Sequence, residues 1–297
     1  MQEDYSINER KLQVVKFDKL IRIPNNAVVS VERQGRNYMQ VSYVARKYKA
    51  TVRRLSRDKY LCVSTGEVKE YSKRCTDKSQ LDYGSLARTF KRLRGLIRHN
   101  FTCEGSNQLF VTLTYEDNMR NANRLFKDFK AFYMRLKRAY KQHDFAYISV
   151  AEPQGRGAWH LHVMLKSLNM SVLYIDNKHM TRLWGHGATY TERLKSDDVG
   201  SYYVSYFTDL VGENKNGGND KKRKKHARLK YYPAGFKLYR VSHGIERPTK
   251  ENIRYSDVVS DDEFKRTYAT SYGLVEVEDF KVKEVVNVIH NETYKRQ

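Results

Sequence analysis

Two histidines one residue apart, with a glutamate upstream, are the residue types of a metal site. His160 and His162 lie in the apolar run 158–165, which predicts a strand, and side chains two apart on a strand share a face. Glu152 follows another apolar and β-branched run, 145–151, and the residues between the runs include a proline and two glycines. The sequence therefore predicts a β-hairpin that brings one carboxylate and two imidazoles to a common face.

This set of ligands suits a divalent ion, and both Mg²⁺ and Mn²⁺ fit it. Two imidazoles and one carboxylate also leave coordination positions open for a substrate. We therefore predict that Glu152, His160 and His162 bind a divalent metal ion. The plainer alternative is that the two histidines are half-exposed strand residues without a ligand.

Two tyrosines further along the chain could supply a nucleophile. The run 197–210 predicts a helix, in which Tyr202 and Tyr206 are four residues apart and share a face, while Tyr203 points about 100° away. A phenol becomes an effective nucleophile when a metal ion polarises the phosphate that it attacks. The product would be a 5′-phosphotyrosine and a free 3′-hydroxyl, and a second tyrosine could make the next attack. The alternative is that these tyrosines only pack.

The charge of the chain indicates a polyanionic partner. The 297 residues include 56 Lys and Arg against 34 Asp and Glu, a formal net charge of +22. The alternatives are a solvated basic surface or lipid headgroups. The sequence has no apolar run long enough for a membrane span and no signal-peptide pattern, so membrane and secreted classes are disfavoured. Three widely spaced cysteines without a CxxC pattern fit a reducing cytosol, and we expect a cytoplasmic protein.

The elements that must position these residues form an α+β pattern. The near-continuous apolar run 109–115 predicts a strand in the interior of a sheet. Apolar residues at helical spacing predict helices on either side of it, and alternation predicts a further strand. The expected helices are 85–98, 123–140 and 177–184, and the further strand is 188–194.

The flanking regions carry no catalytic pattern. We expect a loose arm over 1–25, strands at 27–32 and 38–45, and a hairpin over 60–71. This first third is basic, which fits DNA docking and a solvated face equally well. The segment 213–230 is a basic loop, and the region from 248 onward has late strand-like runs that fit an accessory or oligomerisation role.

Three motifs in this order resemble the HUH endonucleases, specifically the rolling-circle replication initiators (Rep proteins) of plasmids and small phages. LFVTLTY at 109–115 resembles their first motif, and GAWHLHVML at 157–165 matches their His-hydrophobic-His motif. WGHGATYTERLKSDDVGSYYVSYFTDL at 184–210 resembles the segment that ends in their catalytic tyrosines. The resemblance covers about 84–245, which we take as the catalytic domain, between an N-terminal region, 1–83, and a C-terminal segment, 246–297.

The resemblance implies roles for individual residues. His160 and His162 would be metal ligands with Glu152 as the third, and Tyr202 and Tyr206 would be the two catalytic tyrosines. Many relatives carry a lysine three residues after the first tyrosine, but this chain has Ser205 there. A helping lysine would come from the 221–230 run or be absent, and the order of preference for the first attack is Tyr202, Tyr206, Tyr203.

The resemblance also implies a fold and partners. The fold would be an antiparallel sheet with packed helices, of ferredoxin-like type. The sequence contains no GxxxxGK[ST] motif, so unwinding would need a host helicase and synthesis a host DNA polymerase.

The function predicted from this set is site-specific nicking and rejoining of single-stranded DNA at an origin, which starts rolling-circle replication. A relaxase or transposase would use the same chemistry. The alternatives from other classes are a non-catalytic DNA-binding regulator and an RNA-binding protein.

Overall fold

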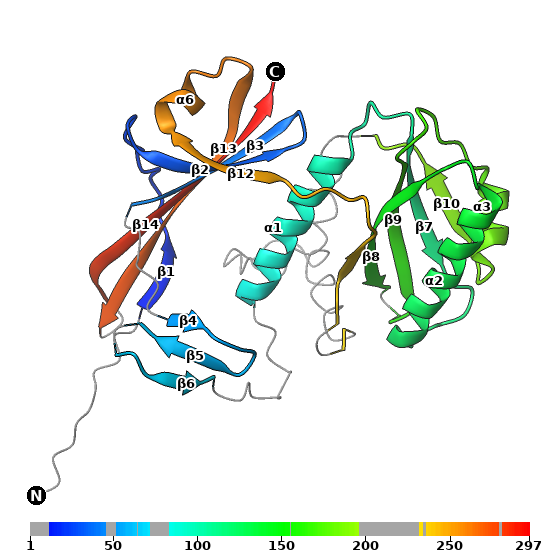
Figure 1. Cartoon of the computed structure of the whole chain (residues 1–297), viewed down its shortest axis with the longest axis horizontal. Coiled ribbons are helices and arrows are strands. Elements are labelled where there is room, and N and C mark those ends of the chain that lie inside the picture. The colour runs from blue at the N-terminus through cyan, green and yellow to red at the C-terminus, as the bar shows by residue number, and fades with distance from the viewer. Residues whose placement is uncertain are drawn as a thin grey trace, which may run out of the picture. The chain divides into compact units, whose positions relative to one another are not determined.

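The chain forms two compact units in a computed structural model that describes residues 12–45, 52–63, 65–71, 83–154, 156–195, 232–233, 236–278 and 281–297. The first, which we call the middle unit, comprises Ser79–Pro248 (Figure 1). The other, which we call the terminal unit, comprises Met1–Lys78 together with Thr249–Gln297. No helix among the described residues has the length and apolar character that a membrane span requires.

The middle unit is built on a five-stranded antiparallel sheet with the strand order β10-β7-β9-β8-β11. Its first four strands and the two helices between them follow one another as β-α-β-β-α-β, the arrangement of a ferredoxin-like fold. The elements are α1 (Tyr83–Asn100), β7 (Gln108–Thr114), α2 (Ala122–Ala139), β8 (Phe145–Pro153), β9 (Trp159–Ser167), α3 (Asn177–Trp184), β10 (Thr189–Glu192) and β11 (Tyr239–Val241). The predicted α+β class with an antiparallel sheet is confirmed.

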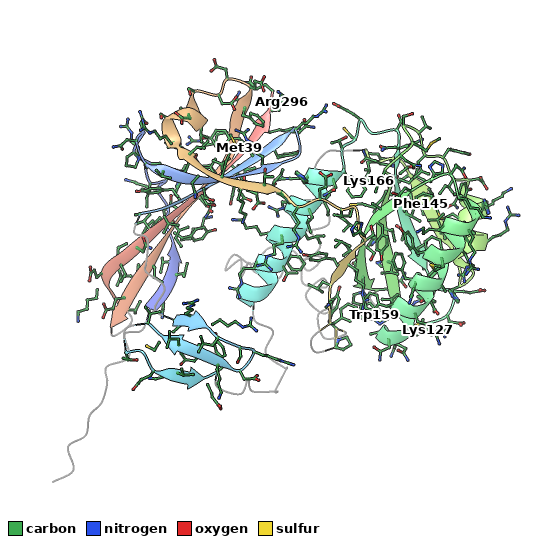
Figure 2. The ribbon with its side chains drawn as sticks, viewed as in Figure 1. Met39, Lys127, Phe145, Trp159, Lys166 and Arg296 are labelled. Carbon is green, nitrogen blue, oxygen red and sulfur yellow. The ribbon has the colours of Figure 1, made fainter. Side chains whose placement is uncertain are left out.

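Helices pack on both faces of this sheet, α2 and α3 on one face and α1 on the other (Figure 1). α2 and α3 pack on one face, where α2 buries four side chains at helical spacing: Leu125, Phe129, Phe132 and Leu136. Phe145 and Trp159, labelled in Figure 2, join this core from opposite ends of the β8–β9 pair. The residues of α1 that pack on the other face include Phe90, Leu93 and Ile97.

Local signals in the sequence determine where these helices and strands end. The side chain of Asn121 accepts hydrogen bonds from two backbone N–H groups of the first turn of α2. Gly185, with a φ of 69°, ends α3 in the left-handed conformation. A Cβ atom at Gly187 would lie 2.4 Å from the backbone nitrogen of Glu116, so only glycine lets the start of β10 approach the end of β7 this closely.

The other unit combines both ends of the chain. Its six-stranded antiparallel sheet has the order β1-β13-β14-β3-β2-β12, and a separate three-stranded sheet has the order β4-β5-β6. The elements are β1 (Leu12–Lys16), β2 (Val28–Gln34), β3 (Tyr38–Val44), β4 (Val52–Arg54), β5 (Lys59–Cys62), β6 (Val68–Glu70), β12 (Thr249–Arg254), α6 (Tyr255–Val259), β13 (Phe264–Glu278) and β14 (Lys281–Arg296). The buried core includes Val29, Val31, Met39, Val41, Tyr255 and Tyr294.

One expectation for the flanking regions needs correction. The expected loose arm contains β1, which pairs with β13 over five residues. The two ends of the chain also share one sheet, because β14 pairs with β3 and β12 pairs with β2. These strand partners lie more than 200 residues apart in the chain. Sequence periodicity shows that a segment is a strand but does not show which distant strand it pairs with.

Candidate metal centre

The register of the β8–β9 pair brings the three predicted ligands together. Glu152 lies directly opposite His160, and His162 lies opposite Val150 on the same face of the sheet. This is the α1-facing side, because Val150 packs with the core residues of α1. The structure therefore places Glu152, His160 and His162 on one face, as the alternation of side chains along each strand requires.

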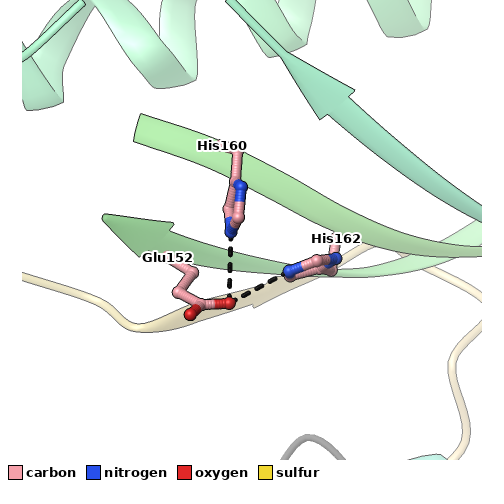
Figure 3. A group of neighbouring side chains, drawn as sticks. All are labelled: Glu152, His160 and His162. Atoms are coloured by element: carbon pink, nitrogen blue, oxygen red, sulfur yellow. Dashed lines mark hydrogen bonds and ion pairs between the residues drawn. The ribbon is translucent and has the colours of Figure 1, made fainter. Parts of the chain in front are cut away.

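The three side chains converge on one point, and Figure 3 shows both rings directed at the same carboxylate oxygen. His160 Nε2 is 3.1 Å and His162 Nε2 is 3.0 Å from Glu152 Oε2, and one ligand atom from each residue lies within 4.8 Å of the others. Among the residues that the structure describes, no other group of three His, Cys or carboxylate side chains meets this distance.

The three side chains of the triad are mostly buried but keep some exposure to solvent. The Glu152 side chain is 8% exposed, and each histidine side chain is 15% exposed. Phe110 lies beside His162 with the two ring planes 14° apart. Each imidazole thus keeps part of its surface open to solvent, while the burial of Glu152 lowers the local dielectric.

The electrostatics suit a cation. Burial by itself raises the pKa of Glu152, but hydrogen bonds and charge attraction from His160 and His162 outweigh it and hold the pKa well below its usual range. Burial also lowers the pKa of His162, by more than the hydrogen bond to Glu152 raises it. An ionised carboxylate and a neutral imidazole are the forms that bind a metal ion.

The second nitrogen of each ring also has a partner. Thr112 Oγ1 is 3.2 Å from His162 Nδ1, and Gln154 Nε2 is 3.4 Å from His160 Nδ1. An imidazole that binds metal through Nε2 carries its proton on Nδ1, which needs an acceptor. The Thr112 hydroxyl can accept it, and so can the Gln154 amide once its oxygen and nitrogen are exchanged. The residues present therefore fit a divalent ion.

Sequence reasoning missed these two partners. Gln154 could have been noticed from its position two residues after Glu152, immediately beyond the end of β8. Thr112 lies on β7 opposite His162, and only the register between two strands fifty residues apart reveals that contact.

The three tyrosines, Tyr202, Tyr203 and Tyr206, and the basic run 221–230 lie outside the described residues. Described residues on both sides of this stretch contact the middle unit. Leu194 packs in the core beneath α1, and the Tyr232 hydroxyl donates a 2.9 Å hydrogen bond to the carbonyl oxygen of Ala151, the neighbour of Glu152.

Residues 108–210 match a family model described as replication-associated protein ORF2. The match begins at β7, contains the whole triad and extends across the three tyrosines. It is consistent with a role of this chain in replication initiation. No match was found among curated proteins or among solved structures.

Proposed function

We propose that this chain is a metal-dependent endonuclease and strand transferase that nicks single-stranded DNA and so initiates rolling-circle replication. The observation that carries the proposal is the convergence of Glu152, His160 and His162 within the segment that matches a replication-associated family. The strong positive charge of the chain supports a nucleic-acid substrate.

The proposed roles follow from the geometry. Glu152, His160 and His162 hold a divalent ion, which when bound acts as a Lewis acid on a phosphate oxygen. Thr112 and Gln154 keep the two rings turned toward the ion by accepting their Nδ1 protons. The partial burial of the triad limits the water that competes for the same position.

Tyr202 is the proposed first nucleophile. Its phenol oxygen attacks phosphorus in line, the bond from phosphorus to the 3′ oxygen breaks, and a 5′-phosphotyrosine forms. The phenol gives up one proton and the leaving 3′ oxygen takes one up, so no other reactant is consumed. The phosphodiester energy stays in the phosphotyrosine link, and rejoining needs no ATP.

Both tyrosines follow closely along the chain after a described part of the middle unit. Tyr202 is seven residues and Tyr206 is eleven residues beyond Lys195, the last described residue before them. Tyr206 is the proposed second nucleophile, which receives the strand in the transfer step. Unwinding and synthesis would fall to a host helicase and a host DNA polymerase.

A covalent-adduct assay tests the proposal. The protein is incubated with end-labelled single-stranded DNA from the region flanking its gene and with Mn²⁺, and the modified peptide is mapped by mass spectrometry. We expect an adduct on Tyr202 or Tyr206 that EDTA abolishes and that Tyr202→Phe or Tyr206→Phe shifts to the remaining tyrosine. An adduct on Tyr203 would keep the chemistry and change the nucleophile.

The second candidate is a DNA-binding regulator without catalysis. One observation favours it: Glu152 Oε2 already accepts from both rings, so the triad is a satisfied hydrogen-bonded cluster without an ion. Tight DNA binding with no adduct on any origin-derived strand would select this alternative. A relaxase or transposase uses the same chemistry and would be recognised by its target sequence.

A further inference from the structure

The three-stranded sheet of the terminal unit has no buried side chain. Every residue of β4, β5 and β6 is exposed or half-buried, including Val52 and Val68. A sheet of this size normally buries one face against another element. The residues that share a face of this sheet are therefore available to a partner.

One face of this sheet places two aromatic rings among cations. Arg54 lies opposite Tyr60, and Tyr60 lies opposite Lys69, so the three side chains share a face. Tyr71 is two residues beyond Lys69, and its ring centroid lies 4.8 Å from that of Tyr60. The Tyr71 side chain is 42% exposed, which leaves its ring accessible to a flat partner.

The charges of the surrounding segment favour an anionic partner. From residue 46 to residue 78 the sequence has eleven Lys and Arg against four Asp and Glu, a net charge of +7. Two of the acids form exposed pairs, Glu67 with Lys69 at 3.1 Å and Glu70 with Lys59 at 3.8 Å. Such exposed pairs contribute little, so a phosphate can replace the carboxylate at low cost.

We propose that the face formed by Arg54, Tyr60, Lys69 and Tyr71 binds single-stranded DNA. Unpaired bases have free faces that stack on tyrosine rings, and the neighbouring cations contact the phosphates. A duplex hides its base faces and would lose the aromatic contribution. The choice of DNA over RNA rests on the proposed function, whereas the binding surface itself does not.

Binding of a fluorescent oligothymidylate to the full chain, measured by anisotropy in EDTA, tests this surface. The double variant Y60A/Y71A should bind about tenfold or more weakly, since stacking contributes ~1–3 kcal/mol per base. Y60F/Y71F keeps both ring faces and should bind as the wild type does. The matched control is Tyr268→Ala, which removes an exposed tyrosine of β13 in the same unit, and it should leave binding unchanged.

Photo-crosslinking keeps the test decisive if Y60A/Y71A fails to fold, which circular dichroism would show. An oligonucleotide carrying 5-iododeoxyuridine is irradiated with the wild-type protein, and a cross-link to Tyr60 or Tyr71 is expected. Wild-type affinity in a folded Y60A/Y71A variant, or cross-links only elsewhere, would overturn the proposal. Tyrosine-dependent binding that is tighter for oligouridylate would overturn the assignment to DNA.

These measurements do not depend on catalysis. EDTA removes any metal-dependent cleavage, so a failure of the adduct assay and a failure of the binding assay are separate results. A chain that binds through Tyr60 and Tyr71 without nicking would retain this inference and lose the proposed function.

Discussion

Two glutamate–histidine clusters, one in each unit, differ in what surrounds the carboxylate. Glu152 accepts hydrogen bonds from two imidazoles, and all three side chains keep some exposure. Glu292 on β14 accepts from four side chains and is 1% exposed. Its donors are His290, Tyr255, Tyr294 and Arg266.

The donors decide what each cluster can do. The two imidazoles at Glu152 can release their hydrogen bonds and offer lone pairs to a metal ion. Arg266, Tyr255 and Tyr294 offer only N–H or O–H donors to Glu292 near neutral pH, and the carboxylate is shared among them. A carboxylate that accepts a hydrogen bond from histidine is thus an open ligand in one unit and a structural anchor in the other.

The anchored cluster even contains a Ser–His–Glu series. Ser271 Oγ is 2.6 Å from His290 Nδ1, and His290 Nε2 is 3.2 Å from Glu292 Oε1. The order of the three groups resembles the triad of serine hydrolases, although the two ring nitrogens have exchanged partners. All three residues are at most 1% exposed, so no substrate reaches the hydroxyl, and the Ser271 oxygen already accepts from the backbone N–H of Ile21. Geometry among side chains makes a site only when a ligand can enter.

The largest expected effect is a loss of nicking activity when the Glu152 cluster is changed. His162→Ala should lower metal-dependent nicking by about a thousandfold or more, because metal polarisation of the phosphate is worth several kcal/mol. Rates on labelled single-stranded origin DNA with Mn²⁺ measure it, and His179→Ala, which removes another imidazole of the same unit, is the control. Undiminished nicking by His162→Ala would remove the functional distinction between the clusters.

The next effect is on stability and lies in the other cluster. Glu292→Gln should lower the free energy of unfolding by about 3 kcal/mol, since it removes a buried charged acceptor from several donors. Urea unfolding measures it. The control is Glu251→Gln, which breaks the exposed pair with Arg33 in the same unit and should cost less than about 1 kcal/mol. Equal losses in both variants would contradict the anchoring role.

Acid should weaken the contribution of Glu292 to the stability of the terminal unit. Burial raises the pKa of Glu292, but hydrogen bonds, foremost from Arg266, lower it by more, so its pKa in the folded chain is below the ordinary 4.5. A depressed pKa contributes stability above the unfolded value, and that contribution is lost as pH falls through the folded value. The stability difference between wild type and Glu292→Gln should therefore shrink below about pH 4.5. A difference that stays constant in acid would show that the charge of Glu292 is not responsible.

The smallest expected effect is on metal affinity and tests what orients the imidazole ring of His162. Thr112→Val removes the hydroxyl beside His162 Nδ1 with little change in shape and should weaken Mn²⁺ binding about tenfold. Calorimetric titration of the DNA-free protein measures it. Thr114→Val is the matched control. Thr114 lies on β7 like Thr112 and is opposite His160 on β9, but no hydrogen bond joins the side chains of Thr114 and His160. Equal affinities in the two variants would mean that Thr112 does not position the ring.

Much of the middle unit could be predicted because its signals are local. Alternation placed His160 and His162 on one face, and the helical spacing of Phe129, Phe132 and Leu136 identified α2. The contacts of Thr112 and the cluster around Glu292 depend on strand register between distant segments, which periodicity does not encode. The roles of Tyr202 and Tyr206 stay predictions.

The pairing of β3 with β14 sets an order of assembly during translation. Ser42 donates a hydrogen bond to Asn291, 249 positions later, and β14 lies between β13 and β3 in the sheet. At 5–20 residues per second the ribosome needs roughly 10–50 s to make that intervening stretch. The middle unit can therefore finish folding first, while the early strands wait for partners that are synthesised last.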